Sequence, residues 1–330
     1  MRLGLLGGLA MAVALMTAGP ATADPACLGA ASRDAAAACS NPELRLLVSP
    51  TPDEALLTPN RPCDTVTQGT PPACAYGVRP RSAAAEVAVL GDSHAQHWRP
   101  ALQYAAKRLS WHVSELAMSQ CPFTAAHPRT RPGSHASYCP GYNGSVLGWL
   151  NRHPEVHTVF VSALAHVKVV AARHETEFWT RVDGYLAAWA LLPASVTKIV
   201  VLHDDPEDRL TTAGCVRRAI AAQRPAGRAC RVRRDVALGE DAQATAADFS
   251  QRDVDVLDFT PQFCGPQWCF PVVGGVLVHR DRDHLTQRFA ETLGPILARE
   301  VIPLLGYEVP SAATARSGLS VKSASTPSAA

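Results

Sequence analysis

The clearest indication of the architecture is the stretch Val87-Ala88-Val89-Leu90-Gly91-Asp92-Ser93-His94-Ala95. Its first four residues are apolar and predict a short buried strand, which Gly91-Asp92 ends. Apolar residues then recur at spacings of four, three and four, which places Trp98, Leu102, Ala105 and Leu109 on one face of a helix. The stretch therefore predicts a strand that leads through a tight turn into a helix.

Ser93 occupies the turn between this strand and this helix. Ligands of open α/β sheets bind at the carboxyl ends of the strands, and a backbone amide at a helix N-terminus can stabilise an anion. Ser93 is therefore a candidate nucleophile. Serine is also a common N-cap residue, so the turn alone supports both interpretations.

Strands and helices alternate from residue 87 onward, which favours a parallel sheet with helices on both faces. The predicted strands are Val87–Leu90, His112–Met118, Thr158–Leu164, Lys198–Leu202 and Val254–Phe259. The predicted helices are Gln96–Leu109, Asn143–Leu150, Glu175–Leu191 and one that begins near Leu285. We therefore expect a three-layer α/β/α domain over residues 86–307, with a parallel five-stranded, flavodoxin-like sheet.

The first 23 residues predict a signal peptide. Arg2 precedes the apolar run Leu3–Met16, which is too short for a comfortable membrane span. Ala21-Thr22-Ala23 then places small residues at positions −3 and −1 of a cut before Asp24. The alternative is an uncleaved membrane anchor. Since no later stretch is long and apolar enough to cross a bilayer, we expect a secreted or periplasmic, cell-envelope protein with no span in the mature chain.

Composition limits the class of partner. Charged residues make up 18% of the chain, the formal net charge is +2, and no basic run is present, so nucleic acid is not an expected partner. Residues 24–85 are rich in Cys and Pro and lack sustained periodicity, which predicts a loop-rich entry segment packed on the core. The Ser- and Ala-rich residues 308–330 predict a disordered tail.

The chain has ten cysteines, and in an exported protein an even number indicates disulfides. They fall in neighbouring pairs, and the simplest connectivity joins each cysteine to its neighbour. The ten are Cys27, Cys39, Cys63, Cys74, Cys121, Cys139, Cys215, Cys230, Cys264 and Cys269. None has C-x₂-C spacing, and His203-Asp204-Asp205 lacks a full ligand set, so we expect no metal site.

A second candidate element lies before the final helix, where Asp281 and His284 are three residues apart. In a turn, both side chains would lie on one side. The carboxylate could then accept from one imidazole nitrogen and leave the other for a serine. Asp283 is a competing partner that we expect to point elsewhere. The alternative interpretation is a solvated charged loop at a helix N-terminus.

Together, the two blocks resemble the SGNH (GDSL-like) hydrolase superfamily. More closely, the chain resembles the SGNH domain associated with O-acyltransferases of the acyltransferase 3 family, roughly from Cys63 to Leu304. The matching residues are Leu90–Trp98, Asp281–Thr286, Cys264 with Cys269, Cys121-Pro122, and Cys139 with Tyr142-Asn143. An α/β-hydrolase would instead have Gly-x-Ser-x-Gly, but Ala95 stands at the second glycine.

The resemblance implies a Ser-His-Asp triad in which Ser93 is the nucleophile, His284 the general base and Asp281 its orienting partner. It also implies an oxyanion hole built from the Ser93 amide, a glycine after the second strand and an asparagine after the third. The stretch after the second strand, Ser119–Cys121, contains no glycine. The stretch after the third strand, Ser162–His166, contains no asparagine.

Asn143 is the substitute donor that we expect for the oxyanion hole, with a helix-cap role as the alternative. We expect His94 and His166 to contact substrate, although His94 could equally be a packed helix residue. Sequence alone leaves these assignments open.

In function, the resemblance implies an exported serine-dependent O-acyltransferase or esterase. It would act on an ester of a cell-envelope carbohydrate through an acyl-enzyme, without a cofactor. A separately encoded membrane acyltransferase would be its partner. The competing interpretation is a non-catalytic envelope-binding or accessory module for such an acyltransferase, which the incomplete oxyanion hole favours.

Overall fold

The computed structural model of the chain describes residues 24–58, 60–129 and 135–305. The predicted signal peptide (1–23) and tail (308–330) lie outside these residues. Within the described ranges, no helix combines the length and the apolar character needed to span a membrane.

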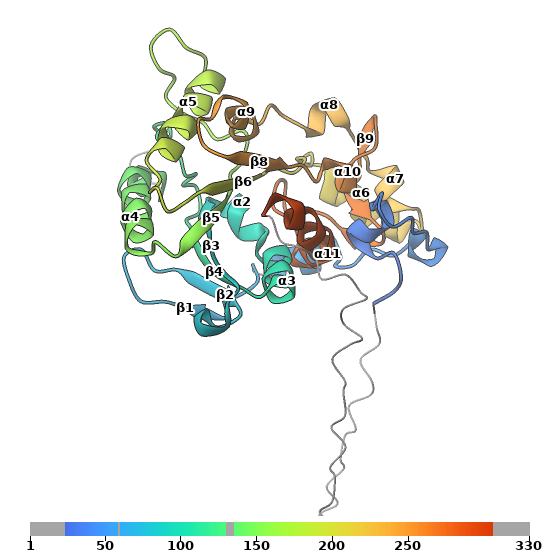
Figure 1. Cartoon of the computed structure of the whole chain (residues 1–330). Helices are drawn as coiled ribbons and strands as arrows, with labels where there is room; N and C mark the ends of the chain where they lie inside the picture. Colours follow the sequence, from blue (N-terminus) through green and yellow to red (C-terminus); the bar gives the residue numbers. More distant parts are fainter. Residues whose placement is uncertain (1–23, 59, 130–134, 306–330) are drawn as a thin grey trace, which may run out of the picture.

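The centre of the molecule is a seven-stranded sheet of order β1-β2-β4-β3-β5-β6-β8 (Figure 1). Five of its strands are parallel: β4 (Trp111–Ala117), β3 (Ala85–Gly91), β5 (Val156–Ser162), β6 (Lys198–Leu202) and β8 (Val254–Leu257). These are the five predicted strands, in the flavodoxin-like order 2-1-3-4-5.

Two further strands from the entry segment, which the sequence analysis did not predict, extend one edge of the sheet. β2 (Cys74–Gly77) pairs antiparallel with β4, and β1 (Thr65–Val66) pairs antiparallel with β2. The α/β class is confirmed, but the sheet is mixed rather than wholly parallel. The two strands are short, and their pattern has no alternation, because pairing to β4 rather than an amphipathic repeat holds them in place.

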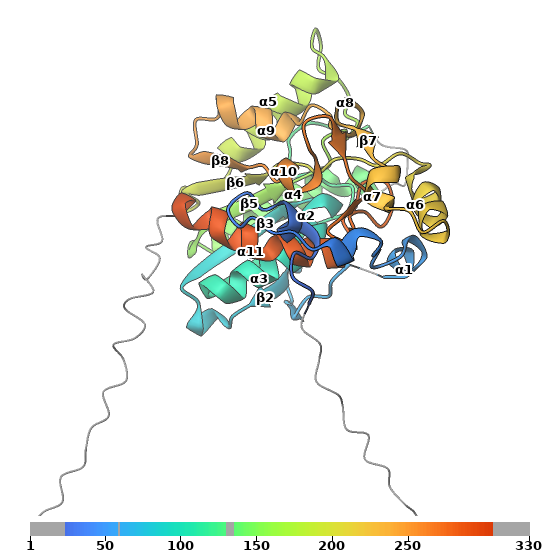
Figure 2. The same cartoon turned by 90° about the vertical axis from the view of Figure 1, so that its right-hand side faces the viewer.

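Helices cover both faces of the sheet, and successive residues of β3 point into the two layers. Val87 and Val89 join the cluster of α3 (Arg99–Leu109) and α11 (Gln287–Leu304), whose helices lie side by side in Figures 1 and 2. Ala88 and Leu90 join the cluster of α4 (Cys139–Arg152), α5 (Glu177–Ala190) and α9 (Ala242–Phe249). All four β3 residues are at most 1% exposed, as expected for a strand buried on both faces.

The helix expected over residues 96–109 is in fact two helices, α2 (Ser93–His97) and α3, which meet at Trp98. Pro100 explains the break, because proline has no backbone N–H to continue α2 and fits only in the first turn of α3. Further elements are α1 (Pro52–Leu57), α6 (Thr212–Ala221), α7 (Ala226–Ala229), α8 (Arg234–Ala237), α10 (Thr260–Phe263), β7 (Val232–Arg233), β9 (Trp268–Cys269), β10 (Val272–Val273) and β11 (Val276–Leu277).

Five disulfides join neighbouring cysteines along the chain, and each of the five predicted pairs is present. The pairs are Cys27–Cys39, Cys63–Cys74, Cys121–Cys139, Cys215–Cys230 and Cys264–Cys269. Short 3₁₀ helices complete the entry segment: η1 (Gly29–Arg33), η2 (Pro42–Arg45) and η3 (Pro80–Ser82). A further one, η4 (His135–Tyr138), precedes α4. The entry segment packs η1 against α10 and α11 and crosses that helical layer in Figure 2.

Candidate active site

Ser93 lies at the carboxyl end of β3, between the neighbouring parallel strands β4 and β5. The strand order reverses direction here, and open α/β sheets bind ligands at such switch points. Ser93 is the first residue of α2, and Asp92 is the N-cap, with Asp92 Oδ1 accepting a hydrogen bond from the His94 amide at 2.8 Å. The capping role belongs to Asp92, which leaves the Ser93 hydroxyl for another partner.

The turn before Ser93 depends on Gly91. Gly91 has φ +143°, and a Cβ built on it would lie 1.9 Å from the carbonyl oxygen of Ser162 in β5. Asp92 Oδ2 accepts a hydrogen bond from the Leu164 amide at 3.1 Å, which ties the turn to the loop after β5. The close approach of β3 and β5 therefore admits only glycine at this position without displacement of the backbone.

The loop before α11 brings His284 to Ser93. His284 Nε2 is 2.9 Å from Ser93 Oγ, and His284 Nδ1 is 3.0 Å from both carboxylate oxygens of Asp281. Asp281 Oδ1 also accepts from the backbone amides of Asp283 at 3.1 Å and His284 at 2.9 Å, which holds residues 281–284 in a turn. The three-residue spacing thus places both side chains on one side, in line with Ser93.

The expectation that the Asp283 side chain points away from His284 is wrong. Its Oδ1 is 3.1 Å from His284 Nδ1, so two carboxylates face the same imidazole nitrogen. The turn is tight enough for adjacent residues to reach the same atom. The second carboxylate could not be predicted from spacing, because neighbouring side chains usually diverge.

These carboxylates set the charge of the imidazole. Burial lowers the pKa of His284, but hydrogen bonds with Asp281 and Asp283 outweigh burial and raise it to about 9. Burial raises the pKa of Asp281, yet its hydrogen bonds with His284 hold it well below the usual range. The hydrogen bond with His284 likewise lowers the pKa of Asp283. The site therefore stabilises a cationic imidazole, which is the form that a general base takes after it accepts a proton.

His94 lies behind this site and not on an open surface. It is 1% exposed, its ring centroid is 5.1 Å from that of His284, and its Nδ1 is 2.6 Å from Asp204 Oδ1. Asp204 Oδ2 accepts from the Ala165 amide at 2.7 Å. Burial lowers the pKa of His94, but Asp204 outweighs burial and raises it to about 10. Of the two sequence interpretations, the structure supports the packed helix residue.

A second set of buried polar side chains continues this network. Asp205 Oδ1 is 3.3 Å from His97 Nε2, and Asp205 Oδ2 is 2.6 Å from His279 Nε2. Burial lowers the pKa of His97 well below its usual value, so its ring is neutral beside Asp205. The residues His203-Asp204-Asp205 thus contribute two buried carboxylates to a hydrogen-bonded network, which sequence reasoning did not foresee.

Part of this network has the donor set of a metal site. One ligand atom each from His94, His97 and Asp205 lie within 4.8 Å of one another. Two imidazoles and a carboxylate are ligands that divalent zinc accepts. The tight hydrogen bond to Asp204 occupies Nδ1 of His94, whereas His94 Nε2, His97 Nε2 and Asp205 Oδ1 have no hydrogen-bond partner among the described residues.

The structure does not bring the other two predicted residues into this arrangement. Both hydrogens of the Asn143 amide are used, because Nδ2 donates to the carbonyl oxygens of Pro122 at 3.0 Å and Thr124 at 3.2 Å. Asn143 therefore holds the loop after β4, and no N–H of its side chain is left for an oxyanion. The His166 side chain is 42% exposed and lies 3.8 Å from Glu207 at the carboxyl end of the sheet.

The turn after β4 contains a conformation that residue types did not reveal. Gln120 has φ +66°, in the left-handed region that favours glycine. The turn adjoins Gly91, because the Met118 amide donates to the Gly91 carbonyl oxygen at 3.0 Å. The sequence analysis looked for a glycine after the second strand. It did not identify Gln120, because glutamine seldom adopts a left-handed conformation.

Comparison with known proteins identifies the family. Residues 61–299 match the family model described as an SGNH domain (fused to AT3 domains). The chain belongs to this SGNH family. The match includes both Ser93 and His284, and it confirms the resemblance drawn from the two sequence blocks.

Among solved structures, this SGNH protein is similar to the periplasmic domain of a lipopolysaccharide acetyltransferase from Salmonella ser. Paratyphi A. The TM-score is 0.51 at 11% sequence identity, and the similarity covers 69% of this chain and 90% of the other. At that identity the likeness supports the fold. No curated protein matches the sequence.

Proposed function

We propose that this SGNH protein is a serine-dependent O-acyltransferase or esterase that acts on an ester of a cell-envelope carbohydrate. Family membership supports acyl transfer or ester hydrolysis in the envelope as the class of activity. The observation that carries the proposal is the contact between Ser93 Oγ and His284 Nε2 at 2.9 Å, with Asp281 behind the imidazole. This is the arrangement of nucleophile, base and orienting group that serine catalysis uses.

In the proposed first half-reaction, neutral His284 takes the proton of Ser93 Oγ as the oxygen attacks the ester carbonyl carbon. The tetrahedral intermediate then collapses, the ester C–O bond breaks, and His284 returns the proton to the leaving alkoxide. Ser93 is left as an acyl ester. In the second half-reaction a water or carbohydrate hydroxyl gives its proton to His284 and attacks this ester. The bond between the acyl carbon and Ser93 Oγ then breaks, His284 returns the proton to Ser93 Oγ, and the acyl group leaves as the free acid or as an ester of the carbohydrate.

The oxyanion would form beside the first turn of α2. The Ser93 amide is in that turn, where backbone N–H groups have no partner within the helix. We propose the backbone of the left-handed turn at Gln120 as the source of a second donor, in place of the glycine of related sites. Removal of one oxyanion donor costs roughly 10²–10³-fold in kcat in serine hydrolases, so this contribution is measurable.

An oxidising compartment outside the cytoplasm is the proposed location. Five disulfides persist in such compartments and are rare in the cytosol. The structural relative is itself described as a periplasmic domain. Since the family model is described as fused to AT3 domains, a membrane acyltransferase is the proposed partner that would supply the acyl group.

A serine-directed phosphonate probe tests the enzyme proposal. We expect the oxidised protein to be labelled at Ser93, and labelling to disappear in Ser93→Ala and fall strongly in His284→Gln. Ser145→Ala is a matched control, because Ser145 lies on α4 and its hydroxyl donates to the Gly141 carbonyl oxygen. Absence of labelling in the folded, oxidised protein would instead favour the non-catalytic accessory module.

Acyl release from a model ester, measured with and without saccharide acceptors, separates the two reactions. A transferase produces acylated saccharide at the expense of free acid. If no saccharide ever receives the acyl group, the esterase version is retained.

A further inference from the structure

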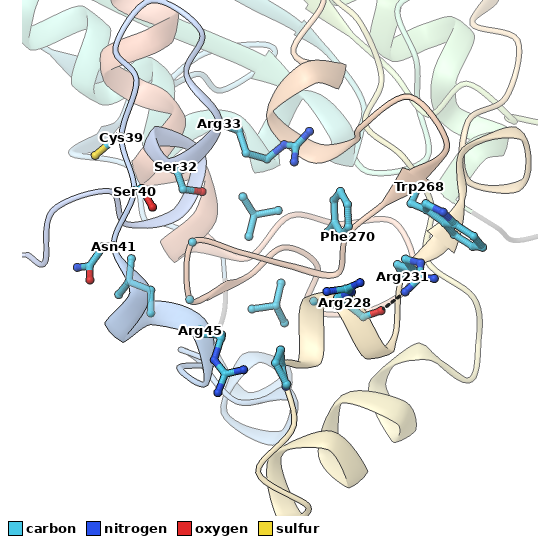
Figure 3. A pocket seen from close by; sticks show the side chains of 17 residues that line it. Ser32, Arg33, Cys39, Ser40, Asn41, Arg45, Arg228, Arg231, Trp268 and Phe270 are labelled. Atoms are coloured by element: carbon cyan, nitrogen blue, oxygen red, sulfur yellow. Dashed lines mark hydrogen bonds between the residues drawn. The ribbon is translucent and has the colours of Figure 1, made fainter.

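A large cavity lies between the entry segment and the loops around α7 and β9–β10 (Figure 3). Its volume is about 660 Å³, within the range of small-ligand sites. Its lining comes from residues 32–45, 225–231 and 268–275, and it includes none of Ser93, Asp281 and His284. The proposed catalytic chemistry therefore leaves this cavity unexplained.

The lining is positively charged. Among the described residues that line it there is no Asp or Glu, whereas four are arginines: Arg33, Arg45, Arg228 and Arg231. Across the described residues, none of these four has a carboxylate within 4.0 Å. By contrast, the nearby Arg233 pairs with Asp235 at 2.5 Å. An arginine cluster without counter-charges can bind carboxylate or phosphate groups.

Aromatic rings hold two of these guanidinium groups in place. The Arg231 guanidinium lies 4.4 Å from the Trp268 ring centroid, and that of Arg33 lies 5.1 Å from the Phe270 centroid. Arg33 also donates to the carbonyl oxygens of Pro261 at 2.9 Å and Cys264 at 2.6 Å. Figure 3 shows Trp268, Phe270 and the arginines around one space. Both rings are half-buried, so each leaves part of its apolar surface to the cavity.

Two disulfides restrain the segments that form the walls. Cys27–Cys39 spans the entry-segment wall, and Cys264–Cys269 restrains the segment that carries Trp268 and Phe270. The Gly29 amide donates to the Gly274 carbonyl oxygen at 2.9 Å, which joins the entry segment to the turn between β10 and β11. A preorganised site loses little conformational entropy on binding, so its charges can contribute to affinity.

We propose that this cavity binds an anionic saccharide, that is, a sugar with a carboxylate or phosphate group. The arginines would bind the anion, with Arg45 and Arg228 exposed at the rim, and Trp268 and Phe270 would pack against the apolar face of the sugar ring. The choice of a saccharide rests on the proposed envelope substrate, whereas the choice of an anion rests on the arginine cluster alone. The cavity would hold an envelope glycan at a second place while Ser93 reacts elsewhere.

Calorimetric titration of the oxidised full chain tests the proposal. The probes are digalacturonic acid, glucose 6-phosphate, inorganic phosphate and the neutral disaccharide maltose. We expect at least one anionic sugar to bind tenfold or more tightly than maltose, with affinity that falls as salt rises because exposed charges are screened. The first two probes distinguish a carboxylate ligand from a phosphate ligand.

Variants locate the binding. Arg45→Gln and Arg228→Gln should each weaken the anionic sugar tenfold or more, and Trp268→Ala should weaken the sugar but not inorganic phosphate. Arg224→Gln is the charge-matched control, because Arg224 is exposed, precedes α7 and does not line the cavity. Equal binding of maltose and the anionic sugars, no binding of any sugar, or full affinity in Arg45→Gln and Arg228→Gln would overturn the proposal.

Two further measurements separate this inference from the proposed function. Ser93→Ala should bind the anionic sugar with unchanged affinity, because Ser93 does not line the cavity. Arg228→Gln should keep its thermal midpoint and its labelling by the phosphonate. Labelling without sugar binding would remove only the cavity proposal, and sugar binding without labelling would remove only the enzyme proposal.

Discussion

His284 faces two carboxylates and one hydroxyl, and this environment decides when it can act as a base. Its pKa is raised to about 9, because the hydrogen bonds that it donates to Asp281 and Asp283 outweigh burial. A general base must be neutral, so in the proposed role only a small fraction of His284 could accept a proton at neutral pH. The two carboxylates therefore stabilise the imidazolium but reduce the fraction of His284 that is neutral at neutral pH.

The pH dependence of kcat/KM follows from this pKa. We expect kcat/KM for a soluble ester to rise about tenfold per pH unit below the pKa of His284 and to level off near pH 9. The measurement is the initial rate of ester hydrolysis between pH 6 and 10, corrected for the rate without protein. A profile that levels off near pH 6.5 would show that the carboxylates do not raise this pKa in solution.

Replacing each carboxylate in turn tests how much Asp281 and Asp283 each contribute to the pKa and the orientation of His284. Asp281→Asn and Asp283→Asn should each shift the rise in kcat/KM to lower pH, because each carboxylate raises the pKa of His284. The plateau should fall modestly in each single variant and by about 10⁴-fold in the double variant, as when a serine triad loses its acid. If Asp283→Asn changes neither the profile nor the plateau, Asp281 alone orients the imidazole.

The connection between β3 and α2 is the element on which the site depends. Its geometry requires Gly91, whose position leaves no room for a Cβ beside β5. Ser93, the proposed nucleophile, is therefore placed by a backbone conformation as much as by its own side chain.

Gly91→Ala should displace the turn and lower both activity and stability, the latter by more than about 1 kcal/mol, because φ there is +143° and the new methyl meets the Ser162 carbonyl. Gly144→Ala is the matched control. Gly144 is an exposed α4 residue with no heavy atom within 4 Å of a built Cβ, so alanine should stabilise by about 0.5–1 kcal/mol. Urea denaturation and phosphonate labelling measure both effects, and equal stability of the two variants would contradict this account.

Hydrophobic periodicity predicted the helices and strands whose packing is regular. The strands β3 and β6 are near-continuous apolar runs, and α11 has a clear apolar stripe, so these elements were predictable. Short elements such as α6, α7 and α9 were not predicted. They follow loops of mixed composition, and their helical form depends on tertiary contacts such as that of α9 with α5.

Across the whole molecule, five local disulfides hold the segments that have little core of their own. Cys121–Cys139 ties the turn after β4 to the start of α4 across 18 residues. Such a link limits the unfolded chain more than the folded one.

Replacement of this pair by serine in Cys121→Ser/Cys139→Ser should lower the free energy of unfolding by about 3 kcal/mol, since a loop of this length contributes about that much. Urea denaturation of the oxidised protein measures the change. The Cys215→Ser/Cys230→Ser variant, with a separation of 15 residues far from Ser93 in sequence, is the comparison for loop length. A loss of less than about 1 kcal/mol would mean that the contacts of Asn143 alone hold the turn.

From the sequence alone, the α/β class could be predicted, neighbour pairing was the simplest connectivity of the cysteines, and Ser93, Asp281 and His284 were candidate site residues. These expectations rest on local patterns, namely apolar runs, short cysteine separations and a three-residue spacing within one turn, together with the family resemblance of the two blocks. Tertiary structure alone decided that His284 meets Ser93 across a separation of 191 residues, and that Asp204 and Asp205 lie behind it. It also placed the arginine-lined cavity. Such contacts depend on how distant segments pack, and that packing is set by the burial of whole layers rather than by any short stretch.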